Sequence, residues 1–185
     1  MCIRDRPTDE ELEHDFLWRI RKHDPTPGQI VAFDRSHYED VLIQRVHEWV
    51  DEEEVDRRIE AIRDYELDLT AKGVKVIKIF LHISKEAQKE NLLERTERPD
   101  KFWKYDPSDV EERAYWDKYM EAYQDAIQRT DENYAPWYVI PTDNKKYARM
   151  ALKFLIVDLL RHVDLEWPAP DFDPEVERQR IEEAD

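Results

Sequence analysis

The sequence predicts an α/β fold with a parallel sheet, and three observations support this prediction. Apolar segments without polar alternation recur at 29–34, 74–83 and 136–141, as expected for strands that are buried on both faces. Each is followed by a segment with the apolar spacing of a helix, and alternating strands and helices favour parallel pairing with right-handed crossovers. The length of 185 residues fits one domain, and no internal repeat divides it.

The first predicted element is a helix over 8–23. Thr8 and Glu11 have the spacing of a capping box, in which each side chain bonds to the backbone amide of the other residue. Apolar residues then recur at helical spacing until the prolines and glycine of 25–28 end the pattern. Residues 1–6 match no element, and we expect an artefactual or frayed N-terminus there.

A helix is predicted directly after the first strand, over 36–50, and a long polar helix follows over 52–72. Ser36 and Glu39 have the spacing of a second capping box. Gly73 is placed to end the long helix, because glycine readily adopts the left-handed conformation of a helix C-terminus.

The same signals divide the rest of the chain. Residues 97–107 contain two prolines beside basic and aromatic residues and have no period, which is typical of a loop. The tail at 165–185 is rich in proline and charge and is expected to be a mobile or surface-bound extension. The predicted elements between these are a strand at 74–83, a helix at 84–96, a helix at 108–129 that starts with a third capping box, a strand at 136–141 and a helix at 143–162.

The composition excludes several classes of protein. The net charge of −16 disfavours a nucleic-acid partner, which would require a basic face. No apolar run approaches the roughly 18 residues of a membrane span, and no signal-peptide pattern is present. The single cysteine permits neither an internal disulfide nor a cysteine zinc site. We therefore expect a cytoplasmic protein with no membrane or nucleic-acid partner.

Glycine is scarce, and this has a direct consequence for phosphate binding. The chain contains two glycines, Gly28 and Gly73. A Walker A loop requires two glycines five positions apart, followed by lysine, so this chain contains none.

Six segments of the chain together carry a resemblance to a known family. They are EHDFLWRI at 13–20, DRSHYED at 34–40, KIFLHISKE at 78–86, RPDKFWKY at 98–105, WDKYMEAY at 116–123 and APWYVIPTDNKKYAR at 135–149. By the order and spacing of these segments, the chain resembles the type 2 polyphosphate kinases over roughly residues 6–162.

The resemblance implies a P-loop kinase-like fold with three layers, α/β/α, in a partial domain over 7–164 with a lid near 95–113. It implies transfer of phosphoryl groups between inorganic polyphosphate and nucleoside mono- or diphosphates, converting AMP or ADP to ADP or ATP. Mg²⁺ is the implied cofactor, with Mn²⁺ as an alternative. The implied partners are polyphosphate, adenine nucleotides with guanine nucleotides as an alternative, and further copies of the chain in a homo-oligomer.

Members of this family begin with a strand, a Walker A loop, its helix and a second strand, and residues 6–8 resemble the last residues after that second strand. The chain is therefore expected to lack the first strand and the phosphate loop, to have unpaired strand edges, and to be inactive alone. Two alternatives stay open: a nucleotide kinase that uses another phosphate donor, and a non-catalytic acidic fragment or interaction module.

Asp34 and its neighbours are the first candidate site residues. Asp34 ends a predicted strand, where open α/β sheets place their chemistry. By the resemblance it is a catalytic residue at the Walker B position and a metal ligand, which would hold Mg²⁺ through water. Arg35 would contact phosphate, or would instead form a salt bridge to Glu39 or Asp40. Glu39 would complete a capping box, contact the nucleotide, or do both.

The lid supplies the second group of candidates. Arg95 is a predicted catalytic residue, and Lys101 and Lys104 would close over polyphosphate and neutralise charge. The alternative for these lysines is an ordinary solvated loop. Arg113 is a further binding candidate that would otherwise pair with Asp109.

The last candidates follow the third predicted strand. Lys145 and Arg149 match a basic pattern of the family and would contact polyphosphate. Asp143 is expected first of all to cap the helix that it precedes. The histidines show no metal-ligand spacing, and we predict no zinc.

Overall fold

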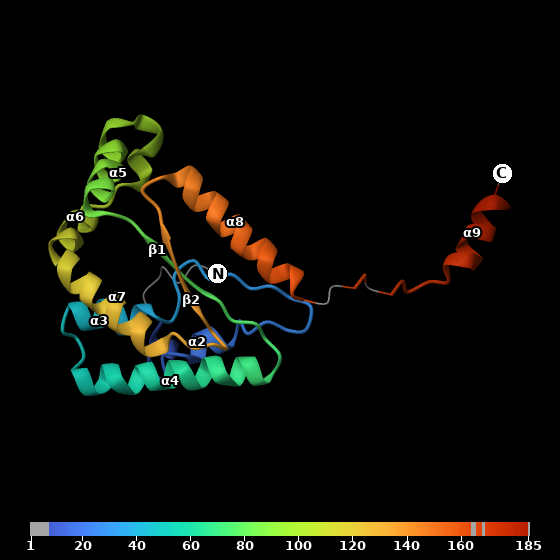
Figure 1. Ribbon diagram of the computed structural model, residues 1–185, viewed down its shortest axis with the longest axis horizontal. Coiled ribbons are helices and arrows are strands. Elements are labelled where there is room, and N and C mark those ends of the chain that lie inside the picture. The colour runs from blue at the N-terminus through green and yellow to red at the C-terminus, as the bar shows by residue number, and fades with distance from the viewer. Residues whose placement is uncertain (1–7, 164–165, 168, 185) are drawn as a thin grey trace. The chain divides into compact units, whose positions relative to one another are not determined.

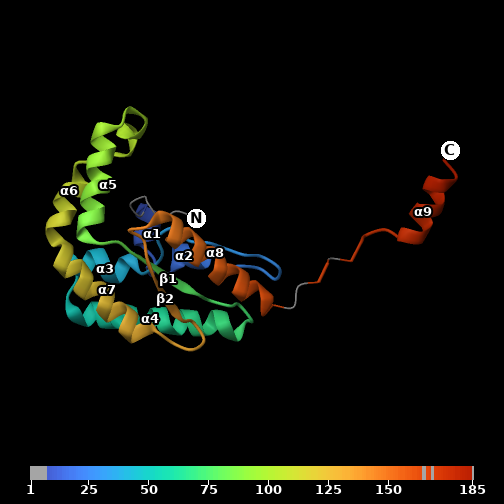
Figure 2. The same cartoon turned by 45° about the horizontal axis from the view of Figure 1, so that its top comes forward.

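A computed structural model describes residues 8–163, 166–167 and 169–184. The chain divides into two compact units, Met1–Asn144 and Lys145–Asp185, and each is described by itself. The prediction for residues 1–6 lies outside the described residues. Figures 1 and 2 show the elements in two orientations.

The first unit combines helices with a parallel sheet, as predicted. Its elements are α1 (Asp9–Leu12), α2 (Trp18–Arg21), α3 (Glu39–Val46), α4 (Glu52–Ala71), β1 (Lys78–His82), α5 (Lys85–Glu97), the 3₁₀ helix η1 (Pro99–Lys104), α6 (Ser108–Glu112), the 3₁₀ helix η2 (Arg113–Tyr115), α7 (Trp116–Thr130) and β2 (Trp137–Pro141).

β1 and β2 pair in parallel, with Lys78 opposite Trp137 and His82 opposite Pro141. Helices α3, α4 and α7 lie together beside these strands (Figures 1 and 2), and their inward side chains form the core. The most deeply buried core side chains are apolar residues of α2, α3 and α4 and of the turn before α2. They include Leu17, Ile20, Val41, Val55, Ile59 and Ile62.

The predicted strand at 29–34 is wrong. Residues 29–33 have no ladder, Asp34 makes only an isolated bridge, and the side chain of Ile30 is 80% exposed. The sheet formed by the described residues contains β1 and β2 alone. An apolar run becomes a strand only where a neighbouring strand accepts its hydrogen bonds, and no described strand does so here.

The predicted capping boxes behave differently from one another. At Thr8 the box forms: its hydroxyl accepts from the Glu11 amide at 3.3 Å, and its own amide donates to the Glu11 carboxylate at 2.9 Å. Beyond it, the single helix predicted over 8–23 is wrong, because a turn divides it into α1 and α2. In that turn the Asp15 carboxylate accepts from the Leu17 amide at 3.0 Å, which is a local alternative to helical bonding.

The other two boxes do not form. The Ser36 hydroxyl accepts from the Tyr38 amide at 3.3 Å, and α3 starts only at Glu39. Ser108 donates its hydroxyl proton to the Asp106 carboxylate at 2.8 Å, and the helix predicted over 108–129 is divided into α6, η2 and α7. In both places a serine bonds two residues away, so the helix start that a box would define is lost.

The predictions for α4 and α5 are confirmed. Gly73 ends α4 with φ +85°, and the Val74 amide donates to the Leu69 carbonyl at 3.0 Å. The Ser84 hydroxyl caps α5 by accepting from the Ala87 amide at 3.1 Å. Part of the predicted loop at 97–107 forms the 3₁₀ helix η1.

The second unit contains α8 (Lys145–Arg161), close to the predicted helix, and α9 (Pro174–Glu182). The tail predicted as an extension therefore holds a helix, which the Asp173 carboxylate caps by accepting from the Glu175 and Val176 amides. In the part of the chain that is described, no helix is both long and apolar enough to span a membrane.

Candidate functional site

The carboxyl ends of β1 and β2 are tied together by polar contacts. The Thr142 amide and hydroxyl donate to the His82 carbonyl at 2.8 and 3.0 Å. The Asp143 carboxylate accepts from the Ser84 amide at 2.8 Å, and this hydrogen bond lowers the pKa of Asp143. Asp143 therefore orders the start of α5, a contact that the sequence did not predict. This edge is where open α/β sheets place their ligands.

Asp34 and Arg35 form a turn ahead of α3. Both side chains are exposed, and Arg35 has φ +65°, a left-handed conformation that is uncommon for a residue with a side chain. Such strain concentrates at functional sites, where the surrounding structure holds it in place.

Glu39, at the start of α3, lies within the electrostatic reach of Arg35. Burial raises the pKa of Glu39, and the charge of Arg35 acts in the opposite direction. Asp40 has other neighbours: its carboxylate accepts from Gln44 at 2.7 Å and lies 3.8 Å from the guanidinium groups of Arg19 and Arg58. The structure thus brings Arg35 together with Glu39, whereas the cations nearest Asp40 come from α2 and α4.

Two tyrosines of α7 complete this group, and the sequence did not predict their role. Tyr123 stacks on Phe80 of β1, with ring centroids 4.4 Å apart. Burial raises the pKa of Tyr123 to about 12, with a further contribution from the charge of Glu39. Tyr119 donates to Glu112 at 2.7 Å, and the pKa of Tyr119 is raised by burial and by that carboxylate. The four-residue spacing of the two tyrosines on one helix face is the signal that could have indicated them.

The predicted lid is a hairpin formed by α5, η1 and α6, at the top of Figure 1. Arg95 donates to the Asp109 carboxylate at 2.7 Å and to the Lys104 carbonyl at 3.3 Å. Lys101 pairs with Glu94 at 2.5 Å. The Lys104 ammonium lies 4.9 Å from the ring centroid of Trp103, whose side chain is 76% exposed.

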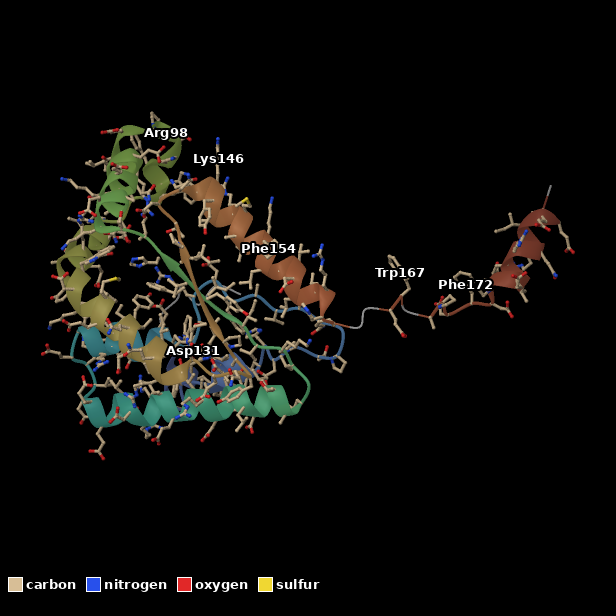
Figure 3. The ribbon with its side chains drawn as sticks, viewed as in Figure 1. Arg98, Asp131, Lys146, Phe154, Trp167 and Phe172 are labelled. Atoms are coloured by element: carbon tan, nitrogen blue, oxygen red, sulfur yellow. The ribbon has the colours of Figure 1, made fainter. Side chains whose placement is uncertain are left out.

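Arg98 lies at the turn of the same hairpin (Figure 3), where it donates to Glu94 at 3.0 Å and to Asp100 at 2.8 Å. The described contacts of these lid cations are thus made within the hairpin. Arg95, Arg98 and Lys101 thus lie in one hairpin, and each is paired with a carboxylate of that hairpin at its surface.

The alternative in which Arg113 pairs with Asp109 is wrong, because Asp109 pairs with Arg95. Arg113 donates at 2.7 Å to the Lys85 carbonyl and at 2.7 Å to the Gln88 side chain. It therefore ties η2 to the first turn of α5, at the base of the lid.

Lys145 and Arg149 lie on α8 in the second unit, so they are described apart from the groups above. Both are exposed and, being four residues apart, share one face of the helix. A cationic strip of this kind suits a polyanion.

Within residues 8–163, 166–167 and 169–184, no group of three or more His, Cys, Asp or Glu side chains could hold a metal. Mg²⁺ usually requires only one or two carboxylates from the protein, with water and substrate phosphates as its other ligands. The exposed carboxylate of Asp34 fits that requirement.

The first unit joins a parallel α/β arrangement, a strained turn before α3 and a helical hairpin that carries Arg95, Lys101 and Lys104. Its likeness to solved kinase structures places it in the P-loop-like class. Comparison with known proteins identifies the family. The model of the polyphosphate kinase 2 family matches residues 3–167, and the chain belongs to this family.

Two curated relatives are similar over most of the chain. The AMP/ADP-polyphosphate phosphotransferase of Meiothermus ruber is 42% identical over 165 residues, which cover 89% of this chain and 62% of that protein. The ADP-polyphosphate phosphotransferase of Rhodopseudomonas palustris is 38% identical, over 88% of this chain and 60% of that protein. The chain thus spans about three fifths of the length of these relatives.

Solved structures agree with this assignment. A polyphosphate kinase 2 from Arthrobacter aurescens TC1 has a TM-score of 0.94 at 49% identity, and the match covers 99% of this chain and 64% of that one. A second, from Pseudomonas aeruginosa, has a TM-score of 0.81 at 34% identity, over 85% of this chain and 34% of that one.

Proposed function

We propose that this chain contributes to a phosphotransferase that moves phosphoryl groups between inorganic polyphosphate and AMP or ADP. The observation that carries the proposal is the strained turn at Arg35, whose positive charge acts on the carboxyl group of Glu39 at the start of α3. Phosphoryl transfer depends mainly on positioning and on neutralising charge, and a fixed guanidinium serves both needs. The names of the relatives support adenine nucleotides as acceptors. Guanine nucleotides are our second choice of acceptor.

Each group has a proposed part in the reaction. Mg²⁺, when bound, neutralises phosphate charge, and Asp34 would hold it through water. Arg35 would bind a phosphate oxygen with its planar fork, and Glu39 would orient Arg35 or the nucleotide. Arg95, Lys101 and Lys104 would exchange their carboxylate and ring partners for polyphosphate when the lid closes.

Other parts of the proposal concern the surroundings of the site. Arg113 is assigned to the lid base, where it holds η2 on α5. Lys145 and Arg149 of α8 would contact polyphosphate. We further propose that the protein acts in the cytoplasm, because a single cysteine is typical of proteins in a reducing compartment. We also propose that it forms a homo-oligomer.

A transfer assay tests the proposal. AMP or ADP is incubated with polyphosphate and Mg²⁺ in the absence of ATP, and the formation of ADP or ATP is followed. The assay is run on the 185-residue chain and on any longer product of its reading frame. Arg35→Ala should lower kcat/KM about 10²–10³-fold, as expected when one charge-stabilising donor is removed.

Arg63→Ala is the matched control, because Arg63 pairs with Glu132 at 2.8 Å on the surface of α4. That variant should retain wild-type transfer. If both protein forms make no nucleotide product from polyphosphate, or if Arg63→Ala lowers transfer as far as Arg35→Ala does, the proposal is refuted. Product formation only with another phosphate donor would indicate the alternative nucleotide kinase.

A further inference from the structure

Glu66 of α4 is the centre of a buried polar network that the functional candidates do not include. Its side chain is only 1% exposed. One carboxylate oxygen accepts from the Tyr38 hydroxyl at 2.9 Å, and the other accepts from the Lys78 ammonium at 2.6 Å. Lys78 also donates to the Thr130 carbonyl at 2.6 Å. The network therefore joins the turn before α3 to α4, β1 and the end of α7.

The network also extends to β2. The Trp137 indole donates to the Thr130 hydroxyl at 2.9 Å, and the Trp137 ring lies edge-on to Tyr38, with centroids 4.9 Å apart. The Trp137 amide donates at 2.9 Å to Asp131, which Figure 3 labels in the turn after α7. The Tyr38 ring is thus held by β2 while its hydroxyl is held by α4.

A gain in stability alone does not explain why Glu66, Lys78 and Tyr38 form a buried polar network. A buried ion pair is often no more stabilising than well-packed apolar residues of the same volume, because removing both charges from water is costly. Hydrogen bonds are directional, so they hold the groups that they join in a single geometry. Burial and the charge of Glu66 raise the pKa of Tyr38, so its hydroxyl stays protonated and remains a donor.

The residue held most directly is Tyr38, and it lies three positions after the strained Arg35. The Tyr38 amide donates to the Ser36 hydroxyl at 3.3 Å, which links its backbone to the turn. A non-glycine residue in the left-handed region is strained, so contacts outside the turn must hold it there. The buried hydroxyl of Tyr38 supplies such a contact on the α3 side of the turn, through its hydrogen bond to Glu66 of α4.

We propose that Glu66 is a positioning residue that acts through Tyr38, with Lys78 as its counterion, to hold the turn at Asp34–Arg35 and to direct Arg35 and Glu39. The link to catalysis rests on the proposed function, whereas the link to the turn does not. Glu66 itself touches no reacting group. Because a misplacement of about 1 Å can cost 10²-fold in rate, a small relaxation of this turn should be visible in kcat.

Tyr38→Phe is the test variant because it removes one hydrogen bond and keeps the ring. Tyr65→Phe is its matched control: Tyr65 is adjacent to Glu66 on α4, is equally buried, and donates to the Asp24 carboxylate at 2.5 Å. Both variants lose a hydrogen bond from a buried tyrosine to a carboxylate, but only the bond of Tyr38 is proposed to hold the turn. A triple variant, Tyr38→Phe with Glu66→Met and Lys78→Met, replaces the network with apolar side chains of similar volume.

Two measurements are made on each protein. The first is the NMR amide shift and hydrogen exchange of Arg35 and Glu39 in the 185-residue chain. The second is kcat and KM for polyphosphate, measured well below the melting temperature in the protein form that passes the transfer assay.

We expect Tyr38→Phe to shift both amides and to lower kcat about 10-fold, with KM changed less than 3-fold, while Tyr65→Phe changes neither readout. The triple variant should regain stability and still show low kcat and shifted amides. Recovery of kcat together with stability in the triple variant, or equal effects of Tyr38→Phe and Tyr65→Phe, would overturn the proposal. If no protein form transfers phosphate, the proposed function fails and the NMR readout alone decides whether Glu66 positions the turn.

Discussion

The network around Glu66 and the lid hairpin hold their charges in opposite ways. Lys78 and Glu66 are almost wholly buried, and each carboxylate oxygen has a fixed donor. In the lid, Arg95 and Asp109 are 34% and 41% exposed, and their neighbours in η1 are also open to water. The buried network favours one geometry, whereas the exposed pairs can be exchanged at little cost. The proposed exchange of lid carboxylates for polyphosphate requires pairs of the second kind.

The first prediction breaks the buried network outright. Glu66→Ala leaves the Lys78 ammonium buried without its carboxylate partner, and we expect it to lower the unfolding free energy by about 3–5 kcal/mol. Glu94→Ala, which removes the lid partner of Lys101 and Arg98, should leave the unfolding free energy almost unchanged, because exposed ion pairs contribute little to stability. Urea unfolding followed by circular dichroism measures both. Equal losses in the two variants would show that the two regions do not differ in this respect.

The second prediction separates function from stability in the lid. Arg95→Ala removes an exposed ion pair, so the unfolding free energy should change by less than about 1 kcal/mol. Phosphoryl transfer should nevertheless fall about 10–100-fold, because a charge that would neutralise polyphosphate is lost. The lid residue Arg98, paired with Asp100 at the turn of the hairpin, offers a control: Arg98→Ala should reduce transfer much less. A similar loss from both variants would mean that the hairpin acts through its overall charge alone.

The third prediction concerns competition for Arg95 within the lid. Asp109→Asn weakens the ion pair that Arg95 forms at 2.7 Å. We expect tighter polyphosphate binding, by up to about 5-fold at low salt, because an exposed pair is worth at most about 1 kcal/mol. The gain should shrink as salt is raised, since screening weakens the exposed pair and the polyphosphate contact alike. Titration calorimetry at two salt concentrations checks this, and unchanged affinity at low salt would contradict it.

The fourth prediction uses pH and has the smallest expected effect. Burial raises the pKa of Glu39 above its ordinary value of 4.5, so the folded protein binds this proton more tightly than the unfolded chain does. The contribution of Glu39 to stability is therefore fully present below pH 4.5 and is lost as the pH rises through the raised pKa of Glu39. Glu39→Gln should be more stable than the wild type at pH 8, and the difference should vanish near pH 4.

Glu54→Gln is a control of opposite sign. Hydrogen bonds from Arg57 and Arg58 lower the pKa of Glu54 to about 2, so its contribution is present above pH 4.5 and is lost as the pH falls toward 2. This variant should be slightly less stable than the wild type at pH 8. Urea unfolding across the pH range tests both signs, and the same sign for both variants would refute the assignment.

The sequence was most informative where neighbours along the chain decide the outcome. The ends of α4 and α5 were predicted because Gly73 and Ser84 satisfy local backbone groups. Predictions that needed a partner elsewhere succeeded less often. The apolar run at 29–34 predicts a strand, but it has no ladder with a described strand. In two of the three predicted capping boxes, the serine hydroxyl instead bonds to a residue two positions away.

The candidate site shows the same division. The resemblance supplied Asp34, Arg35 and Glu39 as one group, and the structure places Arg35 within the electrostatic reach of Glu39. It did not indicate that Asp109 pairs with Arg95 while Arg113 binds the start of α5. All three residues lie on or near a helix terminus, and spacing alone cannot say which cation reaches which acceptor.

The sequence by itself determined the α/β class, the family and the positions of the long helices, because motif order, apolar period and helix caps are properties of neighbouring residues. Only the tertiary structure decided that Glu66 and Lys78 are buried together and that Tyr38 joins them across 28 positions of the chain. The physical reason is that a charged side chain is normally exposed to solvent, so the sequence pattern alone predicts that Glu66 and Lys78 are exposed. The burial of such a side chain depends on partners from distant segments, which only folding brings within hydrogen-bonding distance.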